Sequence, residues 1–229
     1  MAKKKAIPCT PKALPVELQV ASAKQAIEIN PGNAPRVEMP AEVMAFAGMG
    51  AAAAMLDMMT SPAKLAIVTS MWWGTTGVDL TVGFMEQTSV ACRNLFLAHA
   101  NAWSEDAGAN VKFHWTQTSP QVRVSRGRGG YWSYIGTSIL QIPANQQTMN
   151  LEGITERTSD EEWRRVVRHE VGHTLGAQHE QLRQAIVNRI DPQKAIAYFQ
   201  RTSGWDEQTT RFNVLTPLEE RSVIASAGT

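Results

Sequence analysis

The chain has 229 residues, enough for one good-sized domain or two small ones. Hydrophobic residues make up 43% of it and charged residues 19%, which suits a protein that buries a sizeable core. Lysine and arginine (22 residues) balance aspartate and glutamate (21), leaving a formal charge of +1. This balance argues against a nucleic-acid partner bound through a broad basic face and against an acidic solvating tail.

The N-terminal residues do not have the pattern of a secretory signal, because Pro8, Pro11 and Pro15 interrupt any apolar run. The most membrane-like stretch, residues 43–56, is shorter than the roughly 20 apolar residues that a spanning helix needs. We therefore expect no membrane partner and a cytoplasmic protein by default, with signal-independent secretion as the alternative. Oligomeric state is left open.

The first 62 residues differ from the rest. A helix is predicted for residues 15–29, with Pro15 at its start and Pro31-Gly32 after its end. A second helix, rich in alanine and methionine, is predicted for residues 41–59, where methionine is more typical of adaptable core packing than of a docking surface. We assign residues 1–62 to an N-terminal helical extension that is propeptide-like or serves in docking.

Strands and helices alternate in the remainder, residues 63–229. The hydrophobic periodicity predicts strands at residues 65–70, 78–85, 111–115, 122–124, 131–136 and 148–153. One amphipathic helix is predicted for residues 89–106. Another begins near Ser159, where Glu162 completes a capping box.

This last helix carries the residues with metal-binding chemistry. His169 and His173 are four residues apart, so their imidazoles project from one face and can bind one ion at about 2.0–2.1 Å. Glu170 reaches the vicinity of the ion without joining its ligands, where its carboxylate can accept a proton from water. Gly176 can adopt the left-handed conformation that turns the chain back, so that His179 becomes a third ligand. Three histidines leave a fourth position open, as in catalytic zinc sites.

The pattern His-Glu-x-x-His-x-x-Gly-x-x-His over residues 169–179 resembles the metzincin zinc peptidases, and Glu180 after it resembles the astacin-type branch most. Strand and helix order over residues 65–180 is similar to bacterial astacin- and matrixin-like proteases. The resemblance implies an α+β fold in which a twisted mixed sheet packs on two long helices, one bearing the zinc motif. It also implies one Zn²⁺ per chain and a peptide or protein substrate.

The same resemblance implies a substrate-binding strand. The residues Ser133, Tyr134, Ile135 and Gly136 would form the sheet edge above the cleft, and an extended peptide could add to this edge as a further strand. The alternative interpretation is an ordinary edge or hairpin strand.

The sequence departs from the family downstream of the motif. Metzincins carry a methionine turn beneath the zinc, but the last methionine here is Met149. Tyr198, the one tyrosine after His179, lies in a predicted helix, so we expect it to pack rather than to contact the metal. We therefore describe residues 63–229 as a zinc metallopeptidase domain with a short or incomplete C-terminal subdomain.

Three interpretations follow from the sequence. The first is a zinc-dependent endopeptidase that hydrolyses peptide bonds through a metal-activated water, with Glu170 as general base. The second is a catalytically impaired, protease-like domain that binds zinc or peptides without turnover, which the missing methionine turn favours. The third is an incomplete product that does not fold stably.

Two cysteines and three arginines also bear on the candidate site. Cys9 and Cys92 either form one bridge or remain free thiols. A cysteine at position 9 could cap the zinc as an inhibitory switch, although no neighbouring feature favours that role. Arg164, Arg165 and Arg168 are expected to cover the outer side of the zinc-motif helix.

Overall fold

The computed structural model describes residues 9, 10, 12, 14–34, 71–106, 108–179 and 184–217. The helix expected over residues 41–59 and the strand expected over residues 65–70 lie outside the described residues, as does the boundary placed near residue 62.

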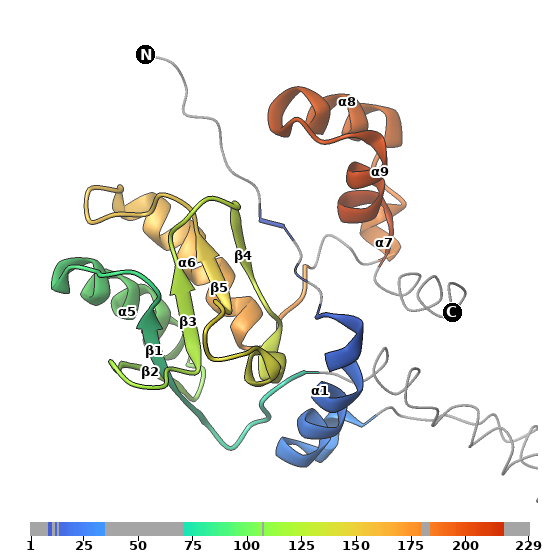
Figure 1. The fold of residues 1–229 in the computed structure, drawn as a ribbon. Coiled ribbons are helices and arrows are strands. Elements are labelled where there is room, and N and C mark those ends of the chain that lie inside the picture. Colours follow the sequence, from blue (N-terminus) through green and yellow to red (C-terminus); the bar gives the residue numbers. More distant parts are fainter. Residues whose placement is uncertain are drawn as a thin grey trace, which may run out of the picture.

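A five-stranded mixed sheet organises the domain (Figure 1). Its order is β2-β1-β3-β5-β4. The strands are β1 (Val78–Phe84), β2 (Val111–Trp115), β3 (Val122–Ser125), β4 (Tyr131–Ser133) and β5 (Met149–Leu151). The first four in spatial order are parallel, whereas β4 runs antiparallel to β5 at the edge. The mixed α+β class expected from the sequence is therefore confirmed.

Two helices, α5 (Val90–Glu105) and α6 (Asp160–Thr174), pack against each other, and each also contacts the sheet. Both begin at a serine whose hydroxyl accepts a backbone N–H of the first turn. Ser89 accepts from Cys92 at 3.2 Å, and Ser159 accepts from Glu162 at 3.4 Å. These caps satisfy donors that have no partner inside the helix. The predicted start of the zinc-motif helix is thus confirmed.

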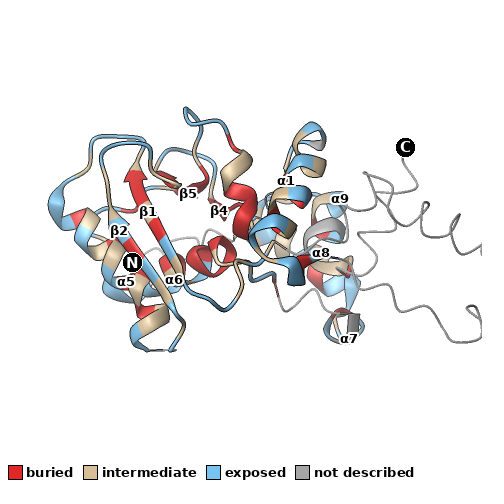
Figure 2. Cartoon of the chain, turned by 90° about the horizontal axis from the view of Figure 1, so that it is seen from below, coloured by how far each residue is buried: buried red, intermediate tan, exposed pale blue. Residues whose placement is uncertain are grey.

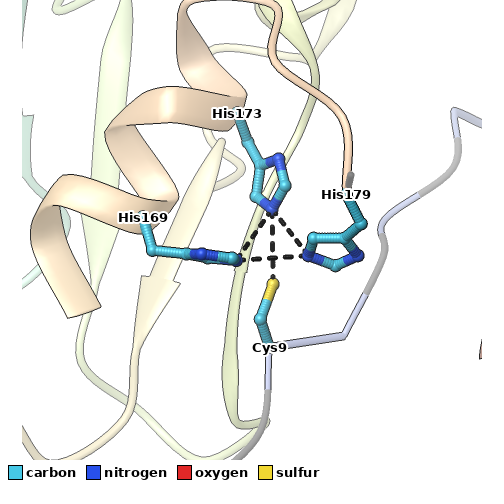
Figure 3. A group of neighbouring side chains, drawn as sticks. All are labelled: Cys9, His169, His173 and His179. Carbon is cyan, nitrogen blue, oxygen red and sulfur yellow. Dashed lines mark hydrogen bonds between the residues drawn. The ribbon is translucent and has the colours of Figure 1, made fainter. Parts of the chain in front are cut away.

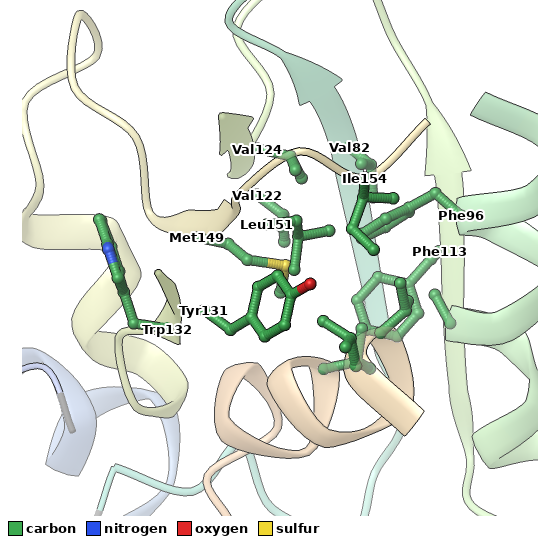
Figure 4. Packing of buried hydrophobic residues seen from close by; sticks show 14 of the residues in the cluster. Val82, Phe96, Phe113, Val122, Val124, Tyr131, Trp132, Met149, Leu151 and Ile154 are labelled. Carbon is green, nitrogen blue, oxygen red and sulfur yellow. The ribbon is translucent and has the colours of Figure 1, made fainter. Parts of the chain in front are cut away.

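The main core lies between these helices and the sheet (Figure 4). Its largest fully buried side chain is Trp163 of α6, whose indole N–H donates to the carbonyl of Thr155 at 3.2 Å. Further fully buried members come from the strands and from α5: Leu80, Val82, Phe96, Val122, Val124, Met149 and Leu151. Figure 2 shows that α6 itself carries many of the buried residues. One face of the zinc-motif helix is therefore anchored in the core.

The N-terminal helix α1 (Val16–Ile29) was expected over residues 15–29, and Pro15 proves to be its N-cap. It packs on the 3₁₀ helix η2 (Gly136–Gln141), where Gln141 donates to the side chain of Gln25 at 2.7 Å. The following 3₁₀ turn, η1 (Pro31–Asn33), places the Asn33 amide 2.7 Å from the carbonyl of Trp72. This segment is therefore joined to the main domain by specific contacts.

The C-terminal region is helical: α7 (Gln184–Val187), α8 (Pro192–Ser203), α9 (Glu207–Thr210) and the π-helical turn η4 (Arg211–Leu215). Asp191 caps α8, and Gly204 ends it with a left-handed φ of 73°. Phe199 stacks on Trp205, with 5.0 Å between ring centroids, while Tyr198 is half exposed and meets Phe199 edge-on. Among the described helices, none is long and apolar enough to cross a membrane.

Candidate metal centre

Helix α6 and the turn after it bring the three motif histidines together (Figure 3). His169 and His173 lie one turn apart on α6. Gly176 then adopts φ 107°, and its N–H donates to the carbonyl of His173 at 2.9 Å. Glycine suits this position because a left-handed backbone strains other residues. The reversed chain returns His179 to the face of α6 that carries the other two imidazoles.

The three Nε2 atoms form a nearly equilateral triangle. The distance from His173 is 3.2 Å to His169 and 3.0 Å to His179, and the third side measures 3.1 Å. Tetrahedral zinc with bonds of about 2.0–2.1 Å to nitrogen would place the nitrogens about 3.4 Å apart. The arrangement fits a single ion with little movement of the side chains.

The hydrogen bonding of His173 supports its role as a ligand. Its Nδ1 lies 2.8 Å from the carbonyl oxygen of Ala177 and must donate to it, so Nε2 carries the lone pair. A backbone partner of this kind commonly fixes a metal-binding imidazole. Burial lowers the pKa of His173. The pKa of His169 is lowered to about 4, first by burial and then by the nearby His173 and Arg165. Neutral imidazoles are the form that binds a metal.

Glu170 is buried beside the three histidines with 1% of its surface exposed. Burial raises the pKa of its carboxyl to about 8, while contacts with Cys9 and Arg165 oppose the rise. The carboxylate does not belong to the group of atoms that could hold one ion. Its position next to that group suits a residue that exchanges protons with water.

Cys9 is the fourth member of the cluster (Figure 3). Its Sγ lies 3.5 Å from Nε2 of His173 and 3.6 Å from the Glu170 carboxylate. Tetrahedral zinc with a bond of about 2.3 Å to sulfur would separate sulfur and nitrogen by about 3.5 Å. Burial, followed by the charge of Glu170, raises the pKa of this thiol in the absence of a metal. The sequence left open whether Cys9 caps the metal as a fourth ligand, and these distances favour that role.

The backbone around Cys9 is held by the edge strand. Cys9 forms a parallel β-bridge with Tyr131 of β4, and the N–H of Thr10 donates to the Tyr131 carbonyl at 2.9 Å. Cys9 and Cys92 are both free thiols, so the two do not form a disulfide. Residues 9 and 10 thus pair with β4 next to the histidines.

A cavity of about 220 Å³ opens beside the cluster. One wall comes from Cys9, β4, α6 and the turn after α6, and it contains Cys9, Tyr131, Arg165, Val166, His169, Glu170 and His179. The other wall belongs to the C-terminal region and contains Phe199, Trp205 and Val214. This apolar C-terminal wall was not anticipated from the sequence. Arg165 was expected on the outer side of the helix, and that expectation is wrong because the side chain lines the cavity.

The strand expected at residues 131–136 is shorter than predicted. β4 ends at Ser133, Tyr134 and Ile135 follow outside the strand, and Gly136 begins η2. Gly136 has φ 49°, and a side chain there would collide with the carbonyl oxygen of Met71. At Gly136 the chain therefore bends toward the interior, and the edge strand ends before this residue.

These four residues also make mostly internal contacts. The Ser133 hydroxyl lies 3.0 Å from that of Thr174 on α6, and Tyr134 is 7% exposed. Substrate binding by Ser133, Tyr134, Ile135 and Gly136 stays a prediction. The edge that the structure offers to an extended segment is Tyr131–Ser133, where Cys9 already pairs.

The fold and the histidine cluster together define a metallopeptidase-type domain. Sequence comparison agrees: the model of the family "Metallo-peptidase family M12B Reprolysin-like" matches residues 69–198, more than half of the chain. The chain therefore belongs to this metallopeptidase family. Among proteins with curated functions, none matches the sequence.

The solved structures that are similar to the chain include two of myroilysin. A structure of myroilysin has 33% sequence identity and a TM-score of 0.56, and the match covers 64% of this chain and 71% of that one. A crystal structure of myroilysin has 35% identity, with coverage of 63% and 62% and a TM-score of 0.48. The first likeness supports the mixed sheet and its helices as a metallopeptidase fold.

Proposed function

We propose that this protein is a zinc-dependent endopeptidase. In this proposal His169, His173 and His179 bind one Zn²⁺, and Glu170 is the general base. The observation that carries the proposal is the triangle of three Nε2 atoms, 3.0–3.2 Å apart, next to a buried carboxylate. Membership of a metallopeptidase family supports it independently.

Zinc at this position would supply Lewis acidity, lowering the pKa of water toward about 7 and polarising a peptide carbonyl. The protein's own groups would transfer the proton and orient the metal ligands. Glu170 accepts the proton of the attacking water and then delivers it to the leaving amine, because its buried carboxyl lies beside the histidine cluster without being one of the ligands. The Ala177 carbonyl keeps His173 in the tautomer that presents Nε2 to the ion.

The contacts of the N-terminal segment support peptide as the substrate. Residues 9 and 10 lie along β4 through backbone pairing, which is how an extended peptide adds to a sheet edge. Cleavage within a chain, rather than at its end, is part of the proposal.

We further propose that the structure represents a latent state of the enzyme. The thiol of Cys9 occupies the fourth position around the histidines at the distance that a zinc thiolate requires. Water and substrate can reach that position only after Cys9 leaves it. The N-terminal extension predicted as propeptide-like would in this way restrain the enzyme.

The branch within the metzincins remains a prediction. Glu180 is the residue that favours the astacin type, and it lies outside the described residues. The matching family model is reprolysin-like.

One alternative function has an observation in its favour. The last methionine among the 229 residues is Met149, upstream of the histidine motif, and none of residues 180–229 is a methionine that could form the methionine turn of the metzincins. A metal site depends on its supporting shell as well as on its ligands. A protein that binds zinc or peptides without turnover is therefore the second candidate.

Hydrolysis of casein by zinc-loaded full-length protein separates the two candidates. We expect little activity in the wild type, strong chelator-sensitive activity in Cys9→Ala, and a loss of roughly 10²–10⁴-fold when Glu170→Gln is added. His114→Gln, at a half-exposed histidine of β2 outside the site, serves as the control. Stoichiometric zinc without hydrolysis in Cys9→Ala would favour the binding protein. Full activity in Cys9→Ala/Glu170→Gln would remove Glu170 from its role.

A further inference from the structure

Arg165 lies on α6 one turn before His169 and lines the cavity beside the metal centre. We propose that Arg165 is a specificity-determining residue that makes the enzyme favour substrates with an acidic side chain next to the cleaved bond. This inference rests on the proposed function, because it names the substrate class of the same site.

The cavity has an unusual distribution of charge. Among its described lining residues, Arg165 is the single arginine or lysine, and Glu170 is the single carboxylate. Phe199, Trp205 and Val214 supply an apolar wall on the other side. A charge pair beside an apolar wall is screened less than one in open water. A substrate side chain that enters between Arg165 and the apolar wall therefore meets the guanidinium as the one cationic side chain among the described lining residues.

The guanidinium is held in a defined orientation. Its Nε donates to one oxygen of Glu162 at 2.8 Å, and its Nη2 donates to the other at 2.7 Å. The Tyr131 ring lies under it, with 5.8 Å between the guanidinium carbon and the ring centroid. The Tyr131 hydroxyl in turn donates to Glu162 at 3.4 Å. Arg165 is thus fixed before a substrate arrives, which reduces the entropy lost on binding.

This arrangement leaves the guanidinium able to bind a second anion. The Glu162 pair uses Nε and Nη2, and in the described part of the chain Nη1 makes no hydrogen bond. Arginine presents five N–H donors in a planar fork that matches carboxylate geometry. The roughly half-exposed side chain can therefore bind Glu162 and a substrate carboxylate together.

The neighbouring arginines do not share this position. Arg168, on the same helix, binds Asp106 at the end of α5 at 2.6 Å and does not line the cavity. It carries the same charge at a similar exposure, with its own carboxylate partner. Arg168 is therefore a matched control for the removal of one positive charge from α6.

Glu162 gives a second and opposite test. Its carboxylate offsets part of the positive charge of Arg165, so Glu162→Gln should increase the attraction for an acidic substrate. If the pair had only a structural role, both substitutions would lower stability and leave substrate preference unchanged. Opposite shifts in preference from the two substitutions are the signature of a specificity role.

The experiment uses zinc-loaded full-length protein carrying Cys9→Ala. Pairs of peptides that differ by Glu against Gln are compared at each position flanking the cleaved bond, and kcat/KM is measured. We expect one position where Glu is favoured by roughly tenfold, as for a charge-assisted hydrogen bond. Arg165→Gln should reduce the ratio to about one and Glu162→Gln should raise it, whereas Arg168→Gln should leave it unchanged.

The ratio compares two peptides on the same variant, so a general change in activity cancels. Equal cleavage of Glu and Gln peptides by the parent enzyme, or an unchanged preference in Arg165→Gln, would overturn the inference while leaving the proposed function intact. If the parent cleaves neither peptide, the endopeptidase proposal has failed. The dissociation constants of the same peptides for zinc-loaded Cys9→Ala/Glu170→Gln, with and without Arg165→Gln, then decide the inference alone. Tighter binding of the Glu peptide that is lost in Arg165→Gln supports the inference. Equal binding of the Glu and Gln peptides, or a preference that persists in Arg165→Gln, contradicts it.

Discussion

The two walls of the cavity are built differently. The α6 wall is anchored in the core, because Trp163, Val166, Val167 and Val171 of the same helix are at most 1% exposed. In the C-terminal wall, by contrast, α8 has one buried residue, Ala195 at 9%, among its described positions, and Figure 2 shows α8 largely exposed. The candidate metal ligand His169 and the neighbouring Glu170 thus lie on the more deeply buried wall, and the apolar C-terminal side chains of the cavity lie on the less buried one.

The largest expected effect is a difference in unfolding free energy between two variants, each of which removes one large aromatic side chain from one wall. We expect Trp163→Ala to lower the free energy of unfolding by about 3–5 kcal/mol, since it leaves a cavity in the core. Phe199→Ala, at a partly exposed position of α8, should cost less than about 2 kcal/mol. Urea denaturation of both variants measures the two values. Equal losses of unfolding free energy in the two variants would show that the two walls are anchored equally well.

The glycines that end α6 and α8 allow a matched test of metal binding. Gly176 and Gly204 both have a left-handed φ, so alanine should cost about 1–3 kcal/mol of unfolding free energy at either. Only at Gly176 would the new Cβ approach another backbone atom, 3.2 Å from Cα of Trp72, whereas at Gly204 it meets nothing within 4 Å. Gly176→Ala should therefore also displace His179 and weaken zinc binding. Competition with a chromogenic chelator reports the affinity, and equal affinities in the two variants would argue against this role of the turn.

The C-terminal wall should influence substrate binding rather than the metal. Trp205→Ala removes an apolar surface of the cavity and leaves the three histidine side chains themselves unaltered. In the Cys9→Ala background we expect KM for an apolar peptide to rise several-fold, as for a loss of about 1 kcal/mol of contact, with zinc content unchanged. Steady-state kinetics and elemental analysis on one sample test both parts. A loss of zinc would show that this wall supports the metal centre as well.

The smallest expected effect concerns pH and the anchoring of α6. His99 of α5 stacks on Trp163 and lies 3.3 Å from Asp160, and burial lowers its pKa although Asp160 opposes the change. Below its ordinary pKa, the unfolded chain binds a proton that the folded chain does not. Stability should therefore fall as pH decreases below about 6.5.

The substitution His99→Phe tests this effect because it keeps an aromatic ring on Trp163. In metal-free protein we expect the loss of stability between pH 7.5 and pH 5 to be smaller in the variant than in the wild type. Arg164 and Arg168 act on His99 in the same direction as burial, and both are unchanged in the variant. An identical pH dependence in the two proteins would show that His99 does not contribute.

Local sequence patterns predicted the motif helix well. The cap at Ser159, the four-residue spacing of His169 and His173, and the turn at Gly176 all depend on residues close in sequence. Each has a local physical cause, so no knowledge of the tertiary structure was needed. The convergence of the three imidazoles followed from the same local geometry.

The other parts of the site depend on contacts between distant segments. Cys9 meets His173 across 164 positions of sequence, and no pattern near Cys9 indicates that contact. Arg165 was expected with Arg164 and Arg168 on the outer side of the helix, whereas it lines the cavity, where it contacts Glu162 and Tyr131. The apolar C-terminal wall likewise forms only when α8 and the turn after it meet the α6 side of the cavity.

The central claim is that three histidines and Cys9 together hold one zinc ion. X-ray absorption at the zinc edge of purified full-length protein tests it most directly. The account predicts about one zinc per chain, with three nitrogen ligands near 2.0 Å and one sulfur near 2.3 Å, and loss of the sulfur alone in Cys9→Ala. Folded protein without zinc, or with zinc in an oxygen-only shell, would contradict the account.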